Sequence, residues 1–175
     1  VYEMIAGFSG FGFPKAHAVA FGLLAYQSTW LRVHYAPEFL CSLLNEQPMG
    51  FYPPDALVHD AQRRGITVQP PDVNLSDVGC SVTRMETEDG VELEPEVQVG
   101  LAYVMGIKKQ DAEAIVKERE RGGEYRDLPD LAARSGASRG ALEALAWAGA
   151  CEQLPHGSRR EALWQLGVTA AAESF

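Results

Sequence analysis

Glycine and proline divide this chain into short segments, and their placement constrains the fold more than any other feature. The 175 residues include 17 glycines and 10 prolines. Most of these stand between stretches in which apolar residues recur every three or four positions, the spacing of a helix face. Glycine and proline interrupt helical backbone. The chain is therefore expected to fold as short helices joined by tight turns.

The helical spacing predicts where those helices lie. They are expected at residues 16–34, 38–45, 55–64, 110–121, 128–134, 138–148 and 158–166, with a candidate helix at residues 1–8. The segment 16–34 has apolar residues on two faces, so this helix is expected to be largely buried. Gly65 and the pair Gly122-Gly123 are expected to end helices, and Ser138 is expected to begin one as an N-cap.

Strand signals are confined to the middle of the chain. Residues 66–68 read as a short strand, and residues 70–76 as an extended connection across a surface. Residues 80–86 and 91–94 flank the pair Asp89-Gly90, which favours a two-residue hairpin turn. A strand near 97–103 is expected to join this hairpin as a meander. The predicted fold class is mainly α with a small β-meander, that is, α+β.

The net charge of −9 is unevenly spread. Residues 76–100 hold seven acidic groups and one basic group, so the predicted hairpin carries most of the acidity. An acidic hairpin edge resists strand pairing and does not indicate acid–base catalysis. Sites that bind nucleic acid through backbone amides and a few cations can therefore lie on either side of it.

Several classes of function receive no support from the sequence. Cys41, Cys80 and Cys151 lack the spacing of a zinc site or a disulfide framework, so they are expected to be buried thiols. The histidines are equally scattered, and no catalytic nucleophile–base pair or carboxylate pair is found. The longest apolar run is under half of the roughly 20 residues that cross a bilayer. No membrane partner is expected, and the cytoplasm is the expected location.

Two segments have the pattern of helix-hairpin-helix units, in which two short helices meet at a glycine-containing turn. Backbone amides at the start of the second helix, with cations beside them, suit a phosphate group. The pair is therefore expected to hold a DNA backbone without reading bases. The alternative is a helical corner that only packs. The residues singled out for DNA binding are Gly106, Lys108, Lys109, Arg134, Gly136, Ser138 and Arg139.

A glycine-rich loop at residues 9–14 feeds the helix at 16–34 and is a second candidate site. Free amides there are flanked by Lys15 and His17, which together suit a phosphate-bearing ligand. The structural alternative is that Lys15 is a solvated residue at the helix start and that His17 bonds a backbone carbonyl. These two residues alone do not name a ligand.

Residues 11–21, 24–31 and 34–37 closely resemble the fingers of bacterial DNA polymerase III alpha subunits, the C family. Residues 45–52, 63–65 and 71–74 are similar to the error-prone, damage-tolerant branch of that family. The tandem hairpins and residues 142–150 resemble the double helix-hairpin-helix that follows the fingers in these enzymes. The resemblance therefore covers nearly the whole chain.

The resemblance implies that the chain is a fragment of an error-prone DNA polymerase used in translesion synthesis and damage-induced mutagenesis. Residues 1–75 would be the C-terminal part of the fingers, 76–104 an acidic β connection, 105–157 the tandem DNA-binding module, and 158–175 a terminal helix and tail. The catalytic palm, which binds Mg²⁺, would lie upstream, so the fragment alone is expected to be inactive. Lys15 would contact a phosphate of the incoming nucleotide, and His17 would lie beside its sugar as a steric gate.

The partners that follow from the resemblance are primer-template DNA and a deoxynucleoside triphosphate. The sliding clamp and mutagenesis accessory proteins are expected through the full-length enzyme. Two rival hypotheses share the C-terminal half of the chain: a noncatalytic helix-hairpin-helix module that binds DNA or serves as a repair scaffold, and a structural domain whose hairpins contact protein.

Overall fold

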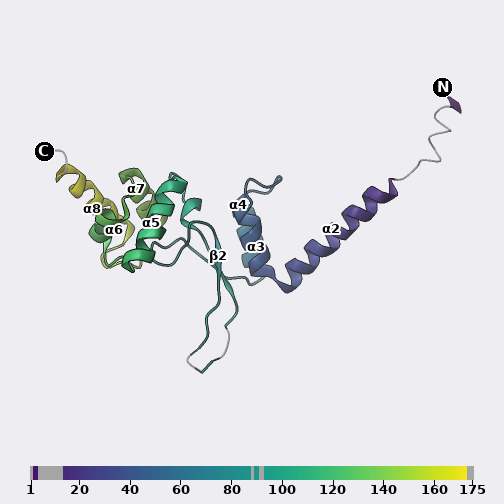
Figure 1. Ribbon diagram of the computed structural model, residues 1–175, viewed down its shortest axis with the longest axis horizontal. Helices are drawn as coiled ribbons and strands as arrows, with labels where there is room; N and C mark the ends of the chain where they lie inside the picture. Colours follow the sequence, from purple (N-terminus) through teal and green to yellow (C-terminus); the bar gives the residue numbers. More distant parts are fainter. Residues whose placement is uncertain (1, 4–13, 88, 91–92, 173–175) are drawn as a thin grey trace.

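A computed structural model describes residues 2–3, 14–87, 89–90 and 93–172 (Figure 1). The elements are α2 (Lys15–His34), α3 (Ala36–Asn45), α4 (Pro54–Arg63), β1 (Val68–Gln69), β2 (Ser81–Thr83), β3 (Glu96–Gln98), the 3₁₀ helix η2 (Leu101–Tyr103), α5 (Lys109–Gly122), α6 (Leu128–Ser135), α7 (Arg139–Ala148) and α8 (Arg159–Ala172). The mainly helical fold class with a small sheet is confirmed. The candidate helix at residues 1–8 and the glycine-rich loop fall mostly outside the described residues.

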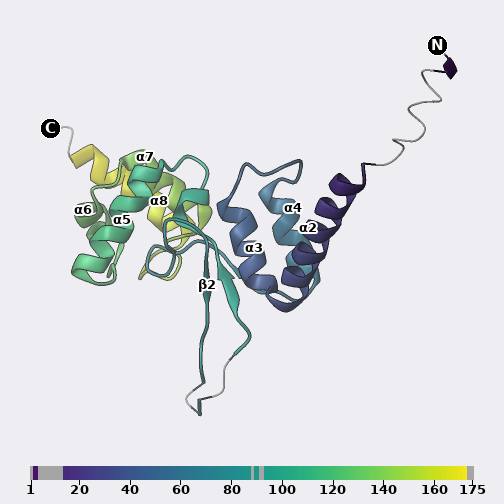
Figure 2. The ribbon, with the colours of Figure 1, turned by 45° about the vertical axis from the view of Figure 1, so that its right-hand side comes forward.

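The prediction that the helix at residues 16–34 is buried is wrong. No residue of α2 is buried, and its large apolar side chains are 40% exposed or more. Figures 1 and 2 show α2 projecting away from the remaining elements, with only its C-terminal end near α3 and α4. Periodicity identifies apolar faces, but it does not establish that any described segment covers them.

The first hydrophobic core joins α3 and α4 to the sheet. Leu40 and Leu44 of α3 and Ala61 of α4 are buried together with Cys80 and Val97. Pro37 and Pro54 stand in the first turns of α3 and α4, where the missing N–H leaves no helical hydrogen bond unmade. This core packs α3 against β2 and β3, with α4 beside α3.

The sheet has the strand order β1-β3-β2, so it is not a meander. The antiparallel partners are β2 and β3, with Val82 opposite Val97, so the predicted pairing of residues 80–86 with 91–94 continues into residues 96–98. The predicted separate strand at 97–103 is wrong, because β3 ends at Gln98 and residues 101–103 form η2. The third strand is β1, which pairs with β3 in parallel through Val68 and Val97. A parallel pair needs a long connection between its strands, and no local pattern identifies that pairing. The predicted strand at 91–94 lies partly outside the described residues.

The prediction that residues 70–76 cross a surface is wrong in part, because the structure buries some of them between the sheet and the C-terminal helices. Val73 and Ser76 are 1% and 0% exposed. Asn74 and Tyr125 exchange two hydrogen bonds, from Asn74 Nδ2 to the Tyr125 carbonyl at 2.9 Å and from the Tyr125 amide to Asn74 Oδ1 at 2.8 Å. The segment therefore ties the sheet to the C-terminal helices.

The second core lies among η2 and α5 to α8, at the opposite end of the molecule from α2 (Figure 1). Leu101, Ile115, Leu131 and Leu145 are each fully buried there. Tyr125 fixes the chain between α5 and α6, because its hydroxyl donates to the Ile115 carbonyl at 2.7 Å.

Every helix in the described part of the chain is too short or too polar to cross a lipid bilayer.

Candidate nucleic-acid interface

The first hairpin is formed by η2, a turn at Gly106 and α5. Gly106 has a φ of +94°, a backbone conformation that residues other than glycine rarely adopt. The turn therefore depends on this glycine. Lys108 is the N-cap of α5 and is exposed. Lys109 is also exposed and lies 3.8 Å from Glu113, a long ion pair. Among the ion pairs of the described residues none includes Lys108, so both lysines present charge to solvent beside the start of α5.

The second hairpin is formed by α6, Gly136 and α7. Gly136 lies in the left-handed region at φ +65°, and the hydroxyl of Ser138 accepts a hydrogen bond from the Ala141 amide at 3.3 Å. The predicted N-cap is therefore confirmed. Arg139 is paired with Glu143 at 2.7 Å, one turn along α7. The second hairpin thus has the expected backbone, but its exposed cation is already partnered.

A carboxylate from the first hairpin occupies the start of the second hairpin's helix. The Ser138 amide donates to Asp111 Oδ1 at 2.9 Å, and its hydroxyl donates to Asp111 Oδ2 at 3.3 Å. These are donors that a bound phosphate would use. Asp111 therefore couples the two hairpins and stands where the sequence suggested a DNA phosphate. Sequence reasoning missed Asp111, because nothing local relates it to a residue 27 positions away.

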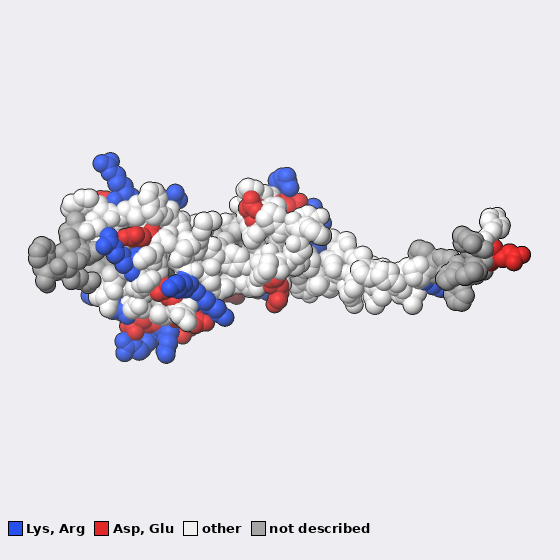
Figure 3. Space-filling view, turned by 90° about the horizontal axis from the view of Figure 1, so that it is seen from above, with Lys and Arg blue, Asp and Glu red and all other residues white. Residues whose placement is uncertain are grey.

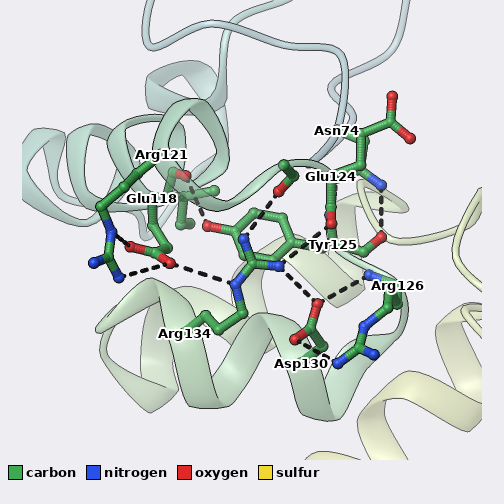
Figure 4. Close-up of polar contacts among 10 residues, drawn as sticks. Asn74, Glu118, Arg121, Glu124, Tyr125, Arg126, Asp130 and Arg134 are labelled. Atoms are coloured by element: carbon green, nitrogen blue, oxygen red, sulfur yellow. Dashed lines mark hydrogen bonds and ion pairs between the residues drawn. The ribbon is translucent and has the colours of Figure 1, made fainter.

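Arg134, the other predicted contact on this hairpin, lies inside a network of internal partners (Figure 4). Its guanidinium pairs with Glu118 at 3.4 Å and Asp130 at 2.9 Å, and donates to the carbonyls of Gly123 and Glu124. The same group lies 5.0 Å from the centre of the Tyr125 ring. These contacts give Arg134 a role in holding α5 to α6, while its assignment to DNA binding stays a prediction.

Both carboxylates of this network titrate below their ordinary range. Hydrogen bonds from Arg121, and then from Arg134, lower the pKa of Glu118. The backbone amide of Arg126 is the main cause that lowers the pKa of Asp130, and Arg134 adds to it. The carboxylates thus remain charged and hold the guanidinium. The i, i+4 spacing of Asp130 and Arg134 could have suggested that pair, whereas Glu118 is 16 residues away.

The exposed charge of the helical module is mixed in sign. Figure 3 shows Lys and Arg side chains projecting from the part that contains α5 to α8, with acidic side chains among them, whereas the surface of α2 on this face is almost uncharged. Of the side chains predicted to bind DNA, those of Lys108 and Lys109 remain the least engaged by carboxylates, because Arg134, Ser138 and Arg139 each contact one at 3.3 Å or less. The structure therefore concentrates the candidate interface on the first hairpin.

Lys15 and His17 lie in the first turn of α2. Both are exposed, and the His17 ring packs against Phe21 with ring centroids 4.4 Å apart. The structure does not test the predicted nucleotide contact, because residues 11–13 of the loop are outside the described part.

Across the described residues, no three His, Cys, Asp or Glu side chains are grouped as metal ligands. Cys41, Cys80 and Cys151 are buried free thiols, as predicted, and burial raises the pKa of Cys151 to about 12.

The model of the helix-hairpin-helix motif family matches residues 65–162, which is more than half of the sequence. The chain belongs to this family. The match begins before β1 and ends in α8, so it includes both hairpins and the sheet that precedes them. The match supports the helix-hairpin-helix prediction, while the DNA contacts assigned to each hairpin stay predictions.

Over nearly its full length the chain is also similar to error-prone DNA polymerases. It is 40% identical to that of Pseudomonas fluorescens (strain Pf0-1) over 95% of the chain, 44% identical to that of Bordetella bronchiseptica over 100%, and 43% identical to that of Mycolicibacterium paratuberculosis over 97%. Each alignment spans only 15–16% of the relative's own length. The predicted resemblance to error-prone polymerases is confirmed.

Proposed function

We propose that this chain serves as the duplex-binding segment of an error-prone DNA polymerase and that the first hairpin makes the main contact with the DNA backbone. The observation that carries the proposal is the exposed turn at Gly106, followed by two lysines at the N-terminal end of α5, in a chain similar to such polymerases throughout. Phosphate contacts of this kind position a protein on DNA without reading its sequence.

The physical basis is the coincidence of three sources of positive potential. The amides of Lys109 and Gln110, the first two of α5, have no partner within the helix, whereas that of Asp111 donates to the Lys108 carbonyl. The helix dipole places partial positive charge at the same end, and two lysines stand beside it. Because Lys108 is the N-cap and Lys109 the first helical residue, both ammonium groups can approach a phosphate that the amides contact. Such a site holds product duplex independently of its sequence.

The test is fluorescence-anisotropy titration of the chain with a labelled duplex across a salt series. Each phosphate contact contributes about −0.9 to the slope of log affinity against log salt for duplex DNA. The double variant Lys108→Ala/Lys109→Ala should therefore reduce the slope by about 1.8. Between 50 and 200 mM salt, this makes the affinity of the unaltered chain fall about twelvefold more than that of the variant.

The matched control is Lys117→Ala, which removes an exposed lysine from the same helix, away from the turn. Its salt slope should stay close to that of the unaltered chain. The proposal is wrong if the control and the hairpin variants lose affinity equally, or if the duplex is not bound at low salt. Either result would favour the rival in which the hairpins contact protein.

The remaining roles belong to the same proposal and are supported by the similarity to error-prone polymerases. Lys15 contacts a phosphate of the incoming deoxynucleoside triphosphate, and His17 lies beside its sugar. The Mg²⁺ ions of the polymerase reaction are held by the palm of the parent enzyme, which acts in the cytoplasm, so this segment positions substrates rather than performing the chemistry. Contacts with the sliding clamp and accessory proteins are made through the parent enzyme.

A further inference from the structure

Three arginines converge on a single carboxylate beside the apolar side of α4. Asp60 pairs with Arg32 of α2 at 3.0 Å, with Arg64 at 2.9 Å and with Arg63 at 3.5 Å. The three arginine side chains are 44–75% exposed. One carboxylate neutralises one of three positive charges, so the cluster keeps a net charge of +2 and has guanidinium N–H groups free to face solvent.

These arginines border a groove between α2, α3 and α4, with a volume of about 580 Å³. Its apolar lining includes Leu40, Leu57 and Ile66, and no acidic side chain other than Asp60 lines it among the described residues. Tyr52, from the loop between α3 and α4, forms part of the wall and is 67% exposed. Its neighbour Phe51 is fully exposed. Figure 3 shows both basic and acidic side chains over the region of α3 and α4.

The arginines, the exposed aromatic rings and the apolar lining of the groove together favour an anionic partner with unstacked bases. A net positive rim favours an anionic partner, and planar guanidinium groups match phosphate oxygens in pairs. An exposed tyrosine beside an apolar surface offers a stacking face for a base. Bases in a duplex are stacked on one another and cannot present their faces to such a ring, whereas bases of an unpaired strand can.

We propose that the groove lined by Arg32, Tyr52, Asp60, Arg63 and Arg64 binds single-stranded nucleic acid. The arginines hold successive phosphates, Asp60 orients the guanidinium groups, and Tyr52 stacks on a base. This α2–α4 groove is separate from the tandem hairpins and goes beyond the proposed duplex contact. If the proposed function holds, the strand it receives is the unpaired template.

The experiment measures the binding of two labelled ligands across a salt series: an oligothymidylate of about 20 nucleotides and a blunt duplex. The oligothymidylate is longer than the roughly 4–16 nucleotides that a single-strand site covers. Tyr52→Ala should weaken oligothymidylate binding about tenfold. Arg63→Ala should reduce the salt slope for the oligothymidylate by about 0.7, the contribution of one phosphate on a single strand. Both side chains are mostly exposed, so circular dichroism should show folded variants.

Arg121→Ala is the matched control. Arg121 is 79% exposed and pairs with a carboxylate three residues away, as does Arg63, which is 75% exposed. Its removal should leave oligothymidylate binding unchanged. In the Lys108→Ala/Lys109→Ala background, duplex affinity should fall while the effect of Tyr52→Ala on the oligothymidylate persists. The duplex affinity therefore tests the proposed hairpin contact, and the oligothymidylate affinity separately tests the proposed groove.

Three results would overturn the proposal. The first is an oligothymidylate affinity of folded Tyr52→Ala and Arg63→Ala that matches the Arg121→Ala control. The second is an absence of oligothymidylate binding at low salt. The third is binding of an acidic, aromatic peptide that Arg63→Ala abolishes while the oligothymidylate affinity stays unchanged, which would make the groove a peptide site.

Discussion

Asp111 should limit the affinity of the tandem hairpins for DNA, because it supplies a carboxylate where a phosphate would bind. It accepts two hydrogen bonds from Ser138, at 2.9 and 3.3 Å. A carboxylate about 6 Å from a phosphate in water repels it by about 0.7 kcal/mol, or about threefold in affinity. Both Asp111→Asn and Asp111→Ala should therefore bind duplex DNA about threefold more tightly, and the gain should shrink as salt rises.

The two substitutions should differ in stability. The asparagine can still accept a hydrogen bond from the Ser138 amide, so Asp111→Asn should unfold in urea close to the unaltered chain. Asp111→Ala loses both hydrogen bonds and should be about 1 kcal/mol less stable, which corresponds to about 2–4 °C in Tm for a chain of this size. The control variant is Glu120→Gln, which removes an exposed acid from the far end of α5. Its DNA affinity and stability should match those of the unaltered chain. Unchanged or weaker DNA binding by folded Asp111→Asn would refute the reasoning.

Two further predictions concern acid stability and nucleotide use. Because the pKa values of Glu118 and Asp130 are lowered by folding, their contribution to stability is present above the pKa of the unfolded chain and is lost as pH falls below about 4.5. Urea unfolding should show this loss, and the double variant Glu118→Gln/Asp130→Asn should have a flatter acid limb; an identical limb would contradict the assignment. In the parent polymerase, Lys15→Ala should raise the KM for deoxynucleotides and His17→Ala should increase ribonucleotide incorporation in primer extension, and unchanged kinetics with both variants would remove the nucleotide role.

The coupling between the hairpins has a consequence for how the module holds DNA. Asp111 links the first turn of α5 to the start of α7, and Arg134 links α6 to the end of α5. The two hairpins are therefore fixed relative to each other before DNA binds. A fixed pair avoids part of the ordering free energy that two mobile loops would lose on binding.

Features that depend on neighbouring residues could be predicted from the sequence. The observed α5, Lys109–Gly122, differs by one residue at each end from the predicted 110–121. Gly136 forms the left-handed turn and Ser138 caps α7, as expected. These features follow from backbone sterics, capping hydrogen bonds and apolar periodicity, all of which act within a few residues.

The tertiary structure decided the features that depend on distant residues. Gly100 illustrates this: a Cβ there would collide with the backbone of Gly79, a close approach that no local pattern reveals. The parallel pairing of β1 with β3, the burial of Val73 and the exposure of α2 likewise depend on which surfaces meet.

The same division runs through the candidate sites. The sequence by itself determined that glycine turns separate the helices and that lysines and arginines stand beside these turns, Lys108 and Lys109 at a helix start and Arg134 at a helix end. Only the tertiary structure showed that Arg134 is held by Glu118 and Asp130, and that Arg32 joins Arg63 and Arg64 at Asp60. A cation's availability depends on the carboxylates that folding brings within a few ångströms, because charge interactions fall with distance in space rather than with separation along the chain.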